Sequence, residues 1–234
     1  MSNRAPPLQI TQQMVLRAYS LGIFPMAESA EDDEIFWVEP HERAIFPLES
    51  LVVSRSLAKT IRQDRFDVRI DTDFDATIEG CAAPAPAREN TWISRSIRDL
   101  YRALFDAGSV HTIECWRAGR LVGGLYGVAL GAAFFGESMF HIERDASKVA
   151  LAHLVARLRR GGFRLLDTQF MTEHLASLGA IEISRAEYRR RLSAATEPPA
   201  GDFWTWPKGM RVEGSVALAA LRGENSGAQE ARLA

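Results

Sequence analysis

Cysteine is scarce in this sequence, and several familiar motifs are absent from it. Only Cys81 and Cys115 occur among 234 residues, too few for a disulfide framework or a closed zinc site, and this usage is typical of the reducing cytoplasm. No segment approaches about 20 uninterrupted apolar residues, and no apolar stretch follows Met1, so we expect neither a membrane span nor a secretory signal. The Gly-x-Ser-x-Gly, His-Glu-x-x-His and Gly-x-x-x-x-Gly-Lys-Ser/Thr motifs are also missing. Serine hydrolases, zincins and P-loop enzymes therefore lose their usual sequence support.

Charge of one sign does not dominate. The 28 basic and 30 acidic side chains give a formal net charge of −2, so an anionic partner must meet a local basic patch. The best candidate is a predicted helix on which Arg55, Lys59 and Arg62 recur at positions i, i+4 and i+7, with Arg65 nearby. This strip could follow a phosphate backbone, although a charged helix face is more often merely solvated.

The 47% hydrophobic and 25% charged composition predicts a folded protein with a sizeable core. Capping residues predict helices that begin near Thr11, Asp73, Ser94, Asp145 and Ser184. Strand-like runs at 111–116, 121–130 and 132–135 precede the predicted helix 147–160, and a buried strand follows at 163–166. This order predicts an α+β fold in which helices cover a mixed central sheet. We expect a small N-terminal domain at 1–44, a main domain at 45–212 and a loose tail at 213–234.

Glycines are unusually dense in one strand-like segment, at positions 123, 124, 127, 131 and 136. Such glycines indicate bulges or a close approach of the backbone to another molecule. Glu137 follows directly and lies among aromatic residues and Met139, where an ionised carboxylate needs a partner. That partner is either a ligand ammonium or an ordinary contact within the protein, such as an arginine or a turn.

Asp167 and Gln169 follow the predicted strand at 163–166, and their i, i+2 spacing places both side chains on one face of an extended segment. Polar side chains at a strand end often form sites, although turn formation before Thr172 is the commoner explanation for these residues taken alone. Trp92 could stack a base or serve as a buried aromatic anchor. The five histidines show no ligand spacing, so no metal is implied.

Seven motifs occur together in a defined order. They are Tyr19-x-x-Gly22-Ile23-Phe24-Pro25, Glu79-Gly80-Cys81-Ala82, Thr91-Trp92-Ile93, Gly123-Gly124-x-Tyr126-Gly127, Gly136-Glu137-Ser138-Met139-Phe140, Ala146-Ser147-Lys148 and His174-x-Ala176-Ser177-Leu178-Gly179-Ala180. With them the chain resembles the leucyl/phenylalanyl-tRNA-protein transferases from about residue 12 to residue 192. The resemblance implies a cytoplasmic, monomeric enzyme that moves Leu or Phe from leucyl- or phenylalanyl-tRNA to the N-terminal Arg or Lys of a protein and so creates an N-degron. It also implies an acetyltransferase-like (GNAT-like) C-terminal domain and no metal or organic cofactor.

The resemblance also assigns roles to residues. The pocket for the transferred side chain would be formed by Leu125, Met139, Leu151, Leu154 and Leu166. Glu137 would support the aminoacyl end of the tRNA, and Asp167 and Gln169 would orient or activate the attacking amine. Trp92 would pack on the terminal adenosine together with Met26, which stands where many members of the family have Trp. The strip from Arg55 to Arg65 would contact the tRNA backbone.

Two alternatives remain open from the sequence. The first is an acyl-CoA-dependent N-acyltransferase, which normally has a glycine-rich turn between a strand and the following helix. Here the corresponding segment, residues 140–145, contains no glycine. The second is a tRNA-binding protein without catalysis, in which the basic strip would matter and Asp167 would not.

Overall fold

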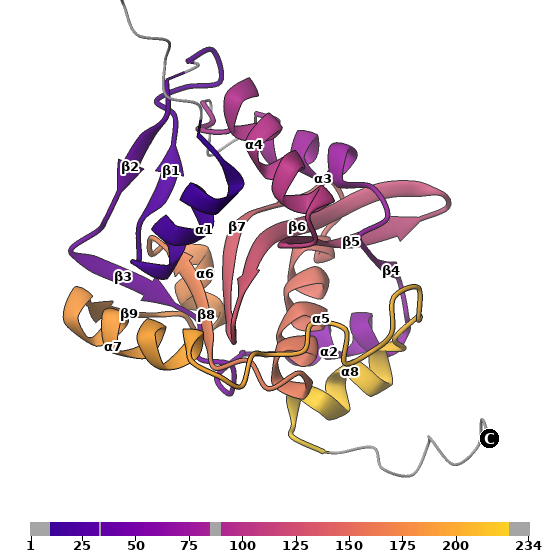
Figure 1. Ribbon diagram of the computed structural model, residues 1–234. Helices are drawn as coiled ribbons and strands as arrows, with labels where there is room; N and C mark the ends of the chain where they lie inside the picture. The colour runs from indigo at the N-terminus through magenta and orange to yellow at the C-terminus, as the bar shows by residue number, and fades with distance from the viewer. Residues whose placement is uncertain (1–9, 33, 85–89, 225–234) are drawn as a thin grey trace, which may run out of the picture.

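The computed structural model describes residues 10–32, 34–84 and 90–224, and its centre is a seven-stranded sheet (Figure 1). In spatial order the strands are β4 (Asp67–Ile70), β5 (Val110–Arg117), β6 (Arg120–Leu130), β7 (Ala133–His141), β8 (Leu165–Gln169), β3 (Glu42–Ile45) and β9 (Ile181–Ser184). β7 and β8 are parallel, whereas every other neighbouring pair in this sheet is antiparallel. The prediction of an α+β fold with a mixed sheet is therefore confirmed.

Helices cover both faces of this sheet and enclose two apolar cores. One core lies under α2 (Arg55–Arg62), α5 (Ala146–Arg160) and α8 (Gly214–Leu221). The second lies under α1 (Gln12–Ser20), α3 (Phe74–Ala82), α4 (Arg95–Asp106) and α7 (Arg185–Thr196). A short helix, α6 (Glu173–Leu178), connects β8 to β9 (Figure 1). The alternation of side chains along each strand thus supplies apolar groups to both faces of the sheet.

The N-terminal part of the chain forms a small unit of its own. α1 leads into a two-stranded antiparallel sheet made of β1 (Phe24–Met26) and β2 (Phe36–Val38). The next strand, β3, belongs to the large sheet, where it pairs with β8 and β9. The expected domain boundary at residue 44 thus falls inside a strand of the large sheet.

Most of the predicted helix caps are present. The side chains of Thr11, Asp73, Ser94 and Ser184 each accept a hydrogen bond from the backbone N–H three residues later. Asp145 is the exception, because its backbone is left-handed, with φ of 71°, and its side chain makes no capping hydrogen bond. The helix therefore begins without the cap that the sequence indicates.

The dense glycines allow neighbouring elements of the protein itself to approach one another. A Cβ atom on Gly127 would lie 2.3 Å from the carbonyl oxygen of Phe135, and one on Gly123 would lie 2.5 Å from Cβ of Ala146. The pairing of β6 with β7 is irregular between Tyr126 and Gly127, which confirms the expected bulge. At these two positions the close approach is to β7 and α5 rather than to another molecule.

The segment predicted to be a loose tail contains a packed helix. Ala217 and Leu218 of α8 are buried, and the helix contacts α5 and α2. The prediction was wrong for residues 214–221 because the alanine-rich composition hid a short apolar face, whereas residues 225–234 lie outside the described part of the chain. Within the described residues, no helix is long and apolar enough to span a membrane.

Candidate active site

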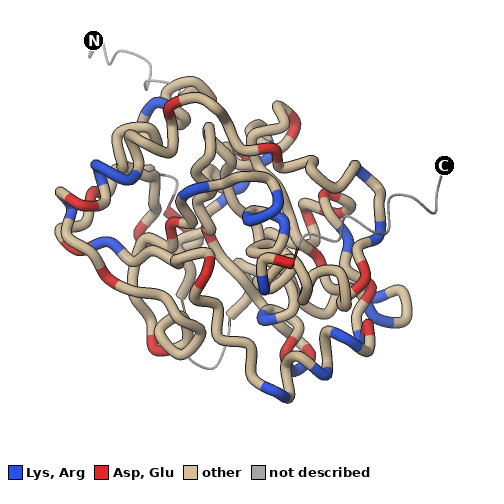
Figure 2. The backbone as a smooth tube through the Cα atoms, turned by 90° about the horizontal axis from the view of Figure 1, so that it is seen from below, with Lys and Arg blue, Asp and Glu red and all other residues tan. Residues whose placement is uncertain are grey.

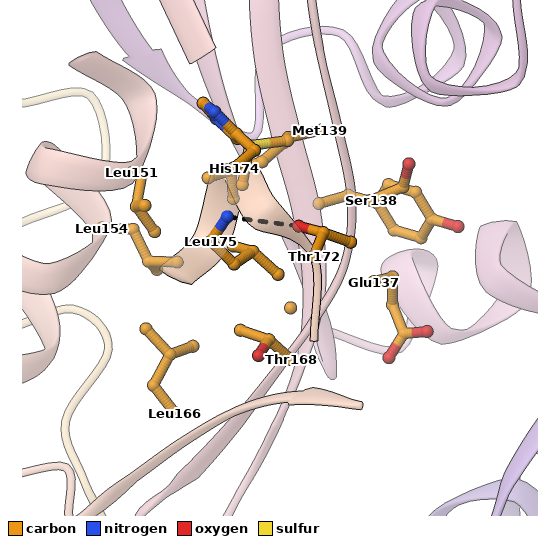
Figure 3. A pocket seen from close by; sticks show the side chains of 13 residues that line it. Glu137, Ser138, Met139, Leu151, Leu154, Leu166, Thr168, Thr172, His174 and Leu175 are labelled. Atoms are coloured by element: carbon orange, nitrogen blue, oxygen red, sulfur yellow. Dashed lines mark hydrogen bonds between the residues drawn. The ribbon is translucent and has the colours of Figure 1, made fainter. Parts of the chain in front are cut away.

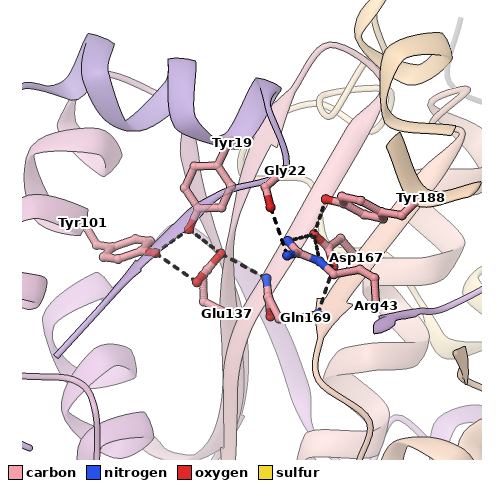
Figure 4. A network of polar contacts seen from close by, with 8 residues as sticks. All are labelled: Tyr19, Gly22, Arg43, Tyr101, Glu137, Asp167, Gln169 and Tyr188. Carbon is pink, nitrogen blue, oxygen red and sulfur yellow. Dashed lines mark hydrogen bonds and ion pairs between the residues drawn. The ribbon is translucent and has the colours of Figure 1, made fainter. Parts of the chain in front are cut away.

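Two adjacent strands bring the predicted site residues together. β7 extends to His141, beyond the run that the sequence predicts, and therefore carries Glu137. β8 extends to Gln169 and carries Asp167, and the parallel register places Phe135 opposite Asp167. Glu137 thus lies beside Asp167 and Gln169 although about 30 residues separate it from them in sequence (Figure 4).

Two tyrosine side chains hold the Glu137 carboxylate. The hydroxyl of Tyr19, from α1, donates to Oε1 over 2.7 Å, and the hydroxyl of Tyr101, from α4, donates to Oε2 over 2.9 Å. The two hydroxyls also contact each other. Three contacts share only two hydroxyl protons when Glu137 is ionised, so a proton on the carboxyl group completes the set. Burial raises the pKa of Glu137 to about 7, although the two tyrosine hydrogen bonds oppose this shift.

Asp167 is fully buried, and both of its carboxylate oxygens have partners. The guanidinium of Arg43, on β3, donates from Nε to Oδ1 over 2.9 Å and from Nη2 to Oδ2 over 2.6 Å. The hydroxyl of Tyr188, on α7, donates to Oδ2 over 2.7 Å, and the backbone N–H of Gln169 donates to Oδ1 over 2.8 Å. This arrangement leaves Asp167 little capacity to accept a proton from a substrate.

Gln169 has a left-handed backbone, with φ of 56°, at the end of β8. Non-glycine residues adopt this conformation rarely, and they do so mostly where surrounding contacts enforce it. The hydrogen bond from its N–H to Asp167 is one such contact. The extended geometry expected from the i, i+2 spacing is therefore replaced by a turn, which aims the side chain at Glu137.

The amide of Gln169 can face Glu137 in two ways. In one orientation, shown in Figure 4, its nitrogen lies 3.5 Å from Oε1 of Glu137. In the other, the nitrogen donates to the carbonyl oxygens of Gly136, at 2.9 Å, and Thr168, at 3.2 Å. The second orientation gives the nitrogen two acceptors and turns Oε1 of Gln169 toward Glu137. Two acceptor groups then face each other, and a donor such as an amine can bridge them only when the two side chains move further apart.

An apolar cavity of about 210 Å³ lies beside these groups (Figure 3). All five residues that the sequence assigns to the side-chain pocket line it, namely Leu125, Met139, Leu151, Leu154 and Leu166. Polar side chains, among them Glu137, Ser138, Thr168, Thr172 and His174, form the rest of its wall. Among the described residues, the buried hydroxyl of Thr168 has no hydrogen-bond partner. The cavity therefore suits an apolar side chain whose polar end reaches the Glu137–Gln169 pair.

No group of three or more His, Cys, Asp and Glu side chains that could hold a metal ion exists within residues 10–32, 34–84 and 90–224.

Burial and the nearby Lys148 and His141 lower the pKa of His174 at the cavity wall. This favours the neutral form of its imidazole near pH 7.

Comparison with known families agrees with the resemblance inferred from the motifs. Residues 45–193 match the model of the leucyl/phenylalanyl-tRNA protein transferase family, and residues 9–41 match its N-terminal domain. The chain belongs to this family. The larger match includes all five pocket residues as well as Glu137, Asp167 and Gln169.

Relatives of this transferase family match almost the whole chain. A leucyl/phenylalanyl-tRNA–protein transferase of Afipia carboxidovorans is 58% identical over 215 residues, which cover 92% of this chain and 94% of the relative. The protein of the same name from Nitrobacter winogradskyi is 56% identical over 226 residues, or 97% of this chain and 100% of the relative. A third, from Rhodopseudomonas palustris strain TIE-1, is 56% identical over 213 residues, with 91% and 94% covered.

Of the remaining residues that the sequence singles out, Trp92 lies beside the site. The ring of Trp92 contacts Tyr101 edge-on, with centroids 6.5 Å apart, and so lies next to the Glu137 group. Met26 lies in β1 and is half-buried. Arg55, Lys59 and Arg62 are exposed on α2, and the exposed Arg65 lies 3.9 Å from Glu143. Along the backbone, basic and acidic positions are interspersed rather than gathered on one side (Figure 2).

Four side chains of the network were not predicted from the sequence to be site residues: Tyr19, Arg43, Tyr101 and Tyr188. Tyr19 stands in a motif that supports the resemblance, and Tyr101 belongs to an apolar helical stripe that indicated only packing. Arg43 and Tyr188 lie in segments whose sequence gives no sign of a buried polar contact. Each reaches Asp167 only because β3 and α7 pack against β8.

Proposed function

We propose that the protein transfers Leu or Phe from leucyl- or phenylalanyl-tRNA to the N-terminal Arg or Lys of acceptor proteins. The observation that carries the proposal is the apolar cavity whose polar wall includes Glu137, next to Gln169. An aminoacyl group has the same two parts, an apolar side chain and an adjacent ester and amine. Family membership and the names of the relatives support this reading.

The reaction needs little from the protein beyond positioning. The α-amine of the acceptor attacks the ester carbonyl carbon, a C–N bond forms, and the C–O bond to the terminal ribose breaks. The amine nitrogen loses a proton and the ribose oxygen gains one. An ester of a tRNA is already activated, and a free α-amine has a pKa of about 7.7 to 8.0, so neither a covalent intermediate nor a cofactor is required.

We assign to Glu137 and Gln169 the binding of the attacking α-amine. Their facing oxygens would accept hydrogen bonds from the attacking amine, and the two side chains, whose facing atoms lie 3.5 Å apart, would separate to admit it. Asp167 orients Gln169 instead of accepting the proton itself, because its own oxygens are occupied by Arg43 and Tyr188. Thr168 offers a further hydroxyl to the aminoacyl group.

The aminoacyl end of the donor tRNA would lie at the cavity. We propose that Trp92 and Met26 pack on the terminal adenosine, and that Arg55, Lys59, Arg62 and Arg65 contact the backbone of the acceptor stem. Support comes from the position of Trp92 beside Tyr101, which itself holds Glu137. The exposure of the basic side chains on α2 leaves them available to phosphates.

The fold and the setting of the reaction are part of the same proposal. We assign the main domain to the acetyltransferase-like class, because β7, α5 and β8 form a parallel crossover inside an otherwise antiparallel sheet. We also propose that the enzyme acts as a monomer in the cytoplasm, where aminoacyl-tRNA and protein N-termini meet, and that its product is an N-degron.

One assay tests the proposal against both alternatives. The protein is incubated with labelled Phe-tRNA or Leu-tRNA and a peptide that begins with Lys or Arg. Transfer of label that prior RNase treatment abolishes is the expected result. Transfer from acetyl-CoA alone would establish an acyl-CoA-dependent enzyme, and tRNA binding without transfer would leave only a binding protein.

A further inference from the structure

Arg43 lies at the junction between the small N-terminal unit and the catalytic strand β8. It is among the largest side chains that are fully buried, yet it does not line the cavity. Its guanidinium donates to both oxygens of Asp167 and, from Nη1, to the carbonyl oxygen of Gly22 over 3.1 Å. A buried guanidinium needs such acceptors, and these two belong to different parts of the site.

Aromatic rings fix the guanidinium on both sides. Its central carbon lies 4.6 Å from the ring centroid of Phe24 and 4.5 Å from that of Tyr188. The hydroxyl of Tyr188 meets the same Asp167 oxygen as Arg43 does. The planar fork of arginine fits this slot and contacts two oxygens at once, which a lysine ammonium cannot reproduce.

The two partners of Arg43, Asp167 and Gly22, are each connected to a different residue of the site. Asp167 accepts the backbone N–H of Gln169 and so supports its left-handed turn. Gly22 follows α1, which carries Tyr19 to Glu137, and a Cβ on Gly22 would lie 2.9 Å from the Tyr188 ring. One side chain thus connects the Gln169 turn with the helix that holds Glu137 (Figure 4).

We propose that Arg43 is a positioning residue for the transfer step, which acts through Asp167 to hold the Gln169 amide against the attacking amine. This inference rests on the proposed function. Displacement of a reacting group by about 1 Å can lower the rate about 100-fold. Loss of the two-point contact of the arginine should therefore slow transfer strongly even when the fold is intact.

A double-mutant cycle tests the proposal. Single-turnover transfer at saturating Phe-tRNA and peptide is measured for wild type, Arg43→Lys, Gln169→Ala and the double variant, and Phe-tRNA affinity is measured in parallel. We expect Arg43→Lys to slow transfer about 10- to 100-fold and to change tRNA affinity less than about threefold. In the Gln169→Ala background the same substitution should cost no more than about threefold, since the group that it positions is gone. Losses that multiply in the double variant, or an Arg43→Lys rate within about twofold of wild type, would overturn the proposal.

Two further variants separate positioning from folding. Arg102→Lys makes the same change at an exposed arginine that pairs with Asp75 and Asp106, and it should transfer at the wild-type rate. If Arg43→Lys does not fold, Tyr188→Phe replaces it in the cycle. We expect Tyr188→Phe to lower the transfer rate about three- to tenfold, and to have no such effect in the Gln169→Ala background. An undiminished rate for Tyr188→Phe, or a loss that persists in that background, would then overturn the proposal. Absence of label transfer by the wild-type protein would instead refute the proposed function.

Discussion

Glu137 makes the stability of the protein depend on pH in an unusual direction. Burial raises its pKa from 4.5 to about 7 in the folded state. Between these two values the unfolded chain releases the proton while the folded protein keeps it, so a rise in pH favours unfolding. The stabilising contribution of Glu137 is therefore complete below about pH 4.5 and is lost as pH rises through 7.

The magnitude follows from the size of the shift. Each pKa unit corresponds to about 1.36 kcal/mol, so a change from 4.5 to about 7 alters the free energy of unfolding by roughly 3 kcal/mol in all. Glu137→Gln keeps the shape and cannot titrate. The free energy of unfolding of wild type minus that of Glu137→Gln should therefore fall by about 2 to 3 kcal/mol between pH 4.5 and pH 7.5.

Urea unfolding, followed by tryptophan fluorescence at four pH values in this range, measures that difference. Glu49→Gln makes the same substitution at an exposed site and serves as the comparison. A difference between wild type and Glu137→Gln that stays constant, or that grows with pH, would refute the assignment of a buried, proton-holding carboxyl to Glu137.

Three more predictions address the basic strip from Arg55 to Arg65, the cavity and the C-terminal helix. Charge reversal at Lys59 and Arg62 should weaken tRNA binding about tenfold at low salt and flatten its salt dependence, whereas unchanged affinity in a filter-binding titration would mean that the strip is only solvated. Leu151→Phe narrows the apolar cavity, so kcat/KM for phenylalanyl-tRNA should fall about tenfold relative to leucyl-tRNA; equal losses for both donors would contradict this placement. Gly214→Ala would put a Cβ atom 1.9 Å from the carbonyl oxygen of Ile61 and should lower the free energy of unfolding by about 1 to 3 kcal/mol, and a urea midpoint equal to that of wild type would show that α8 can shift freely.

Motif order was the strongest information in the sequence. It indicated the family, which the family model and the relatives confirm, and it selected five pocket residues that line one cavity. Local patterns also located most helices and four of their caps, because apolar spacing and capping depend on residues only a few positions apart.

Errors arose where local patterns conflict with packing. Asp145 has the right residue type for a cap, but its left-handed backbone prevents the usual geometry. The alanine-rich face of α8 stabilises the helix only when α5 and α2 bury it. Nothing within either short segment reveals these neighbours.

The sequence by itself determined the composition of the site: an acidic residue in an apolar strand, an Asp-x-Gln pair at a strand end and a set of flexible apolar side chains. Only the tertiary structure decided what those residues do to one another. The parallel register of β7 and β8 sets Glu137 beside Gln169, and the approach of β3 and α7 gives Asp167 its arginine and tyrosine partners. The cause is physical, since charge and hydrogen bonding act over a few ångströms in space and these partners lie 21 to 124 residues from Asp167 in sequence.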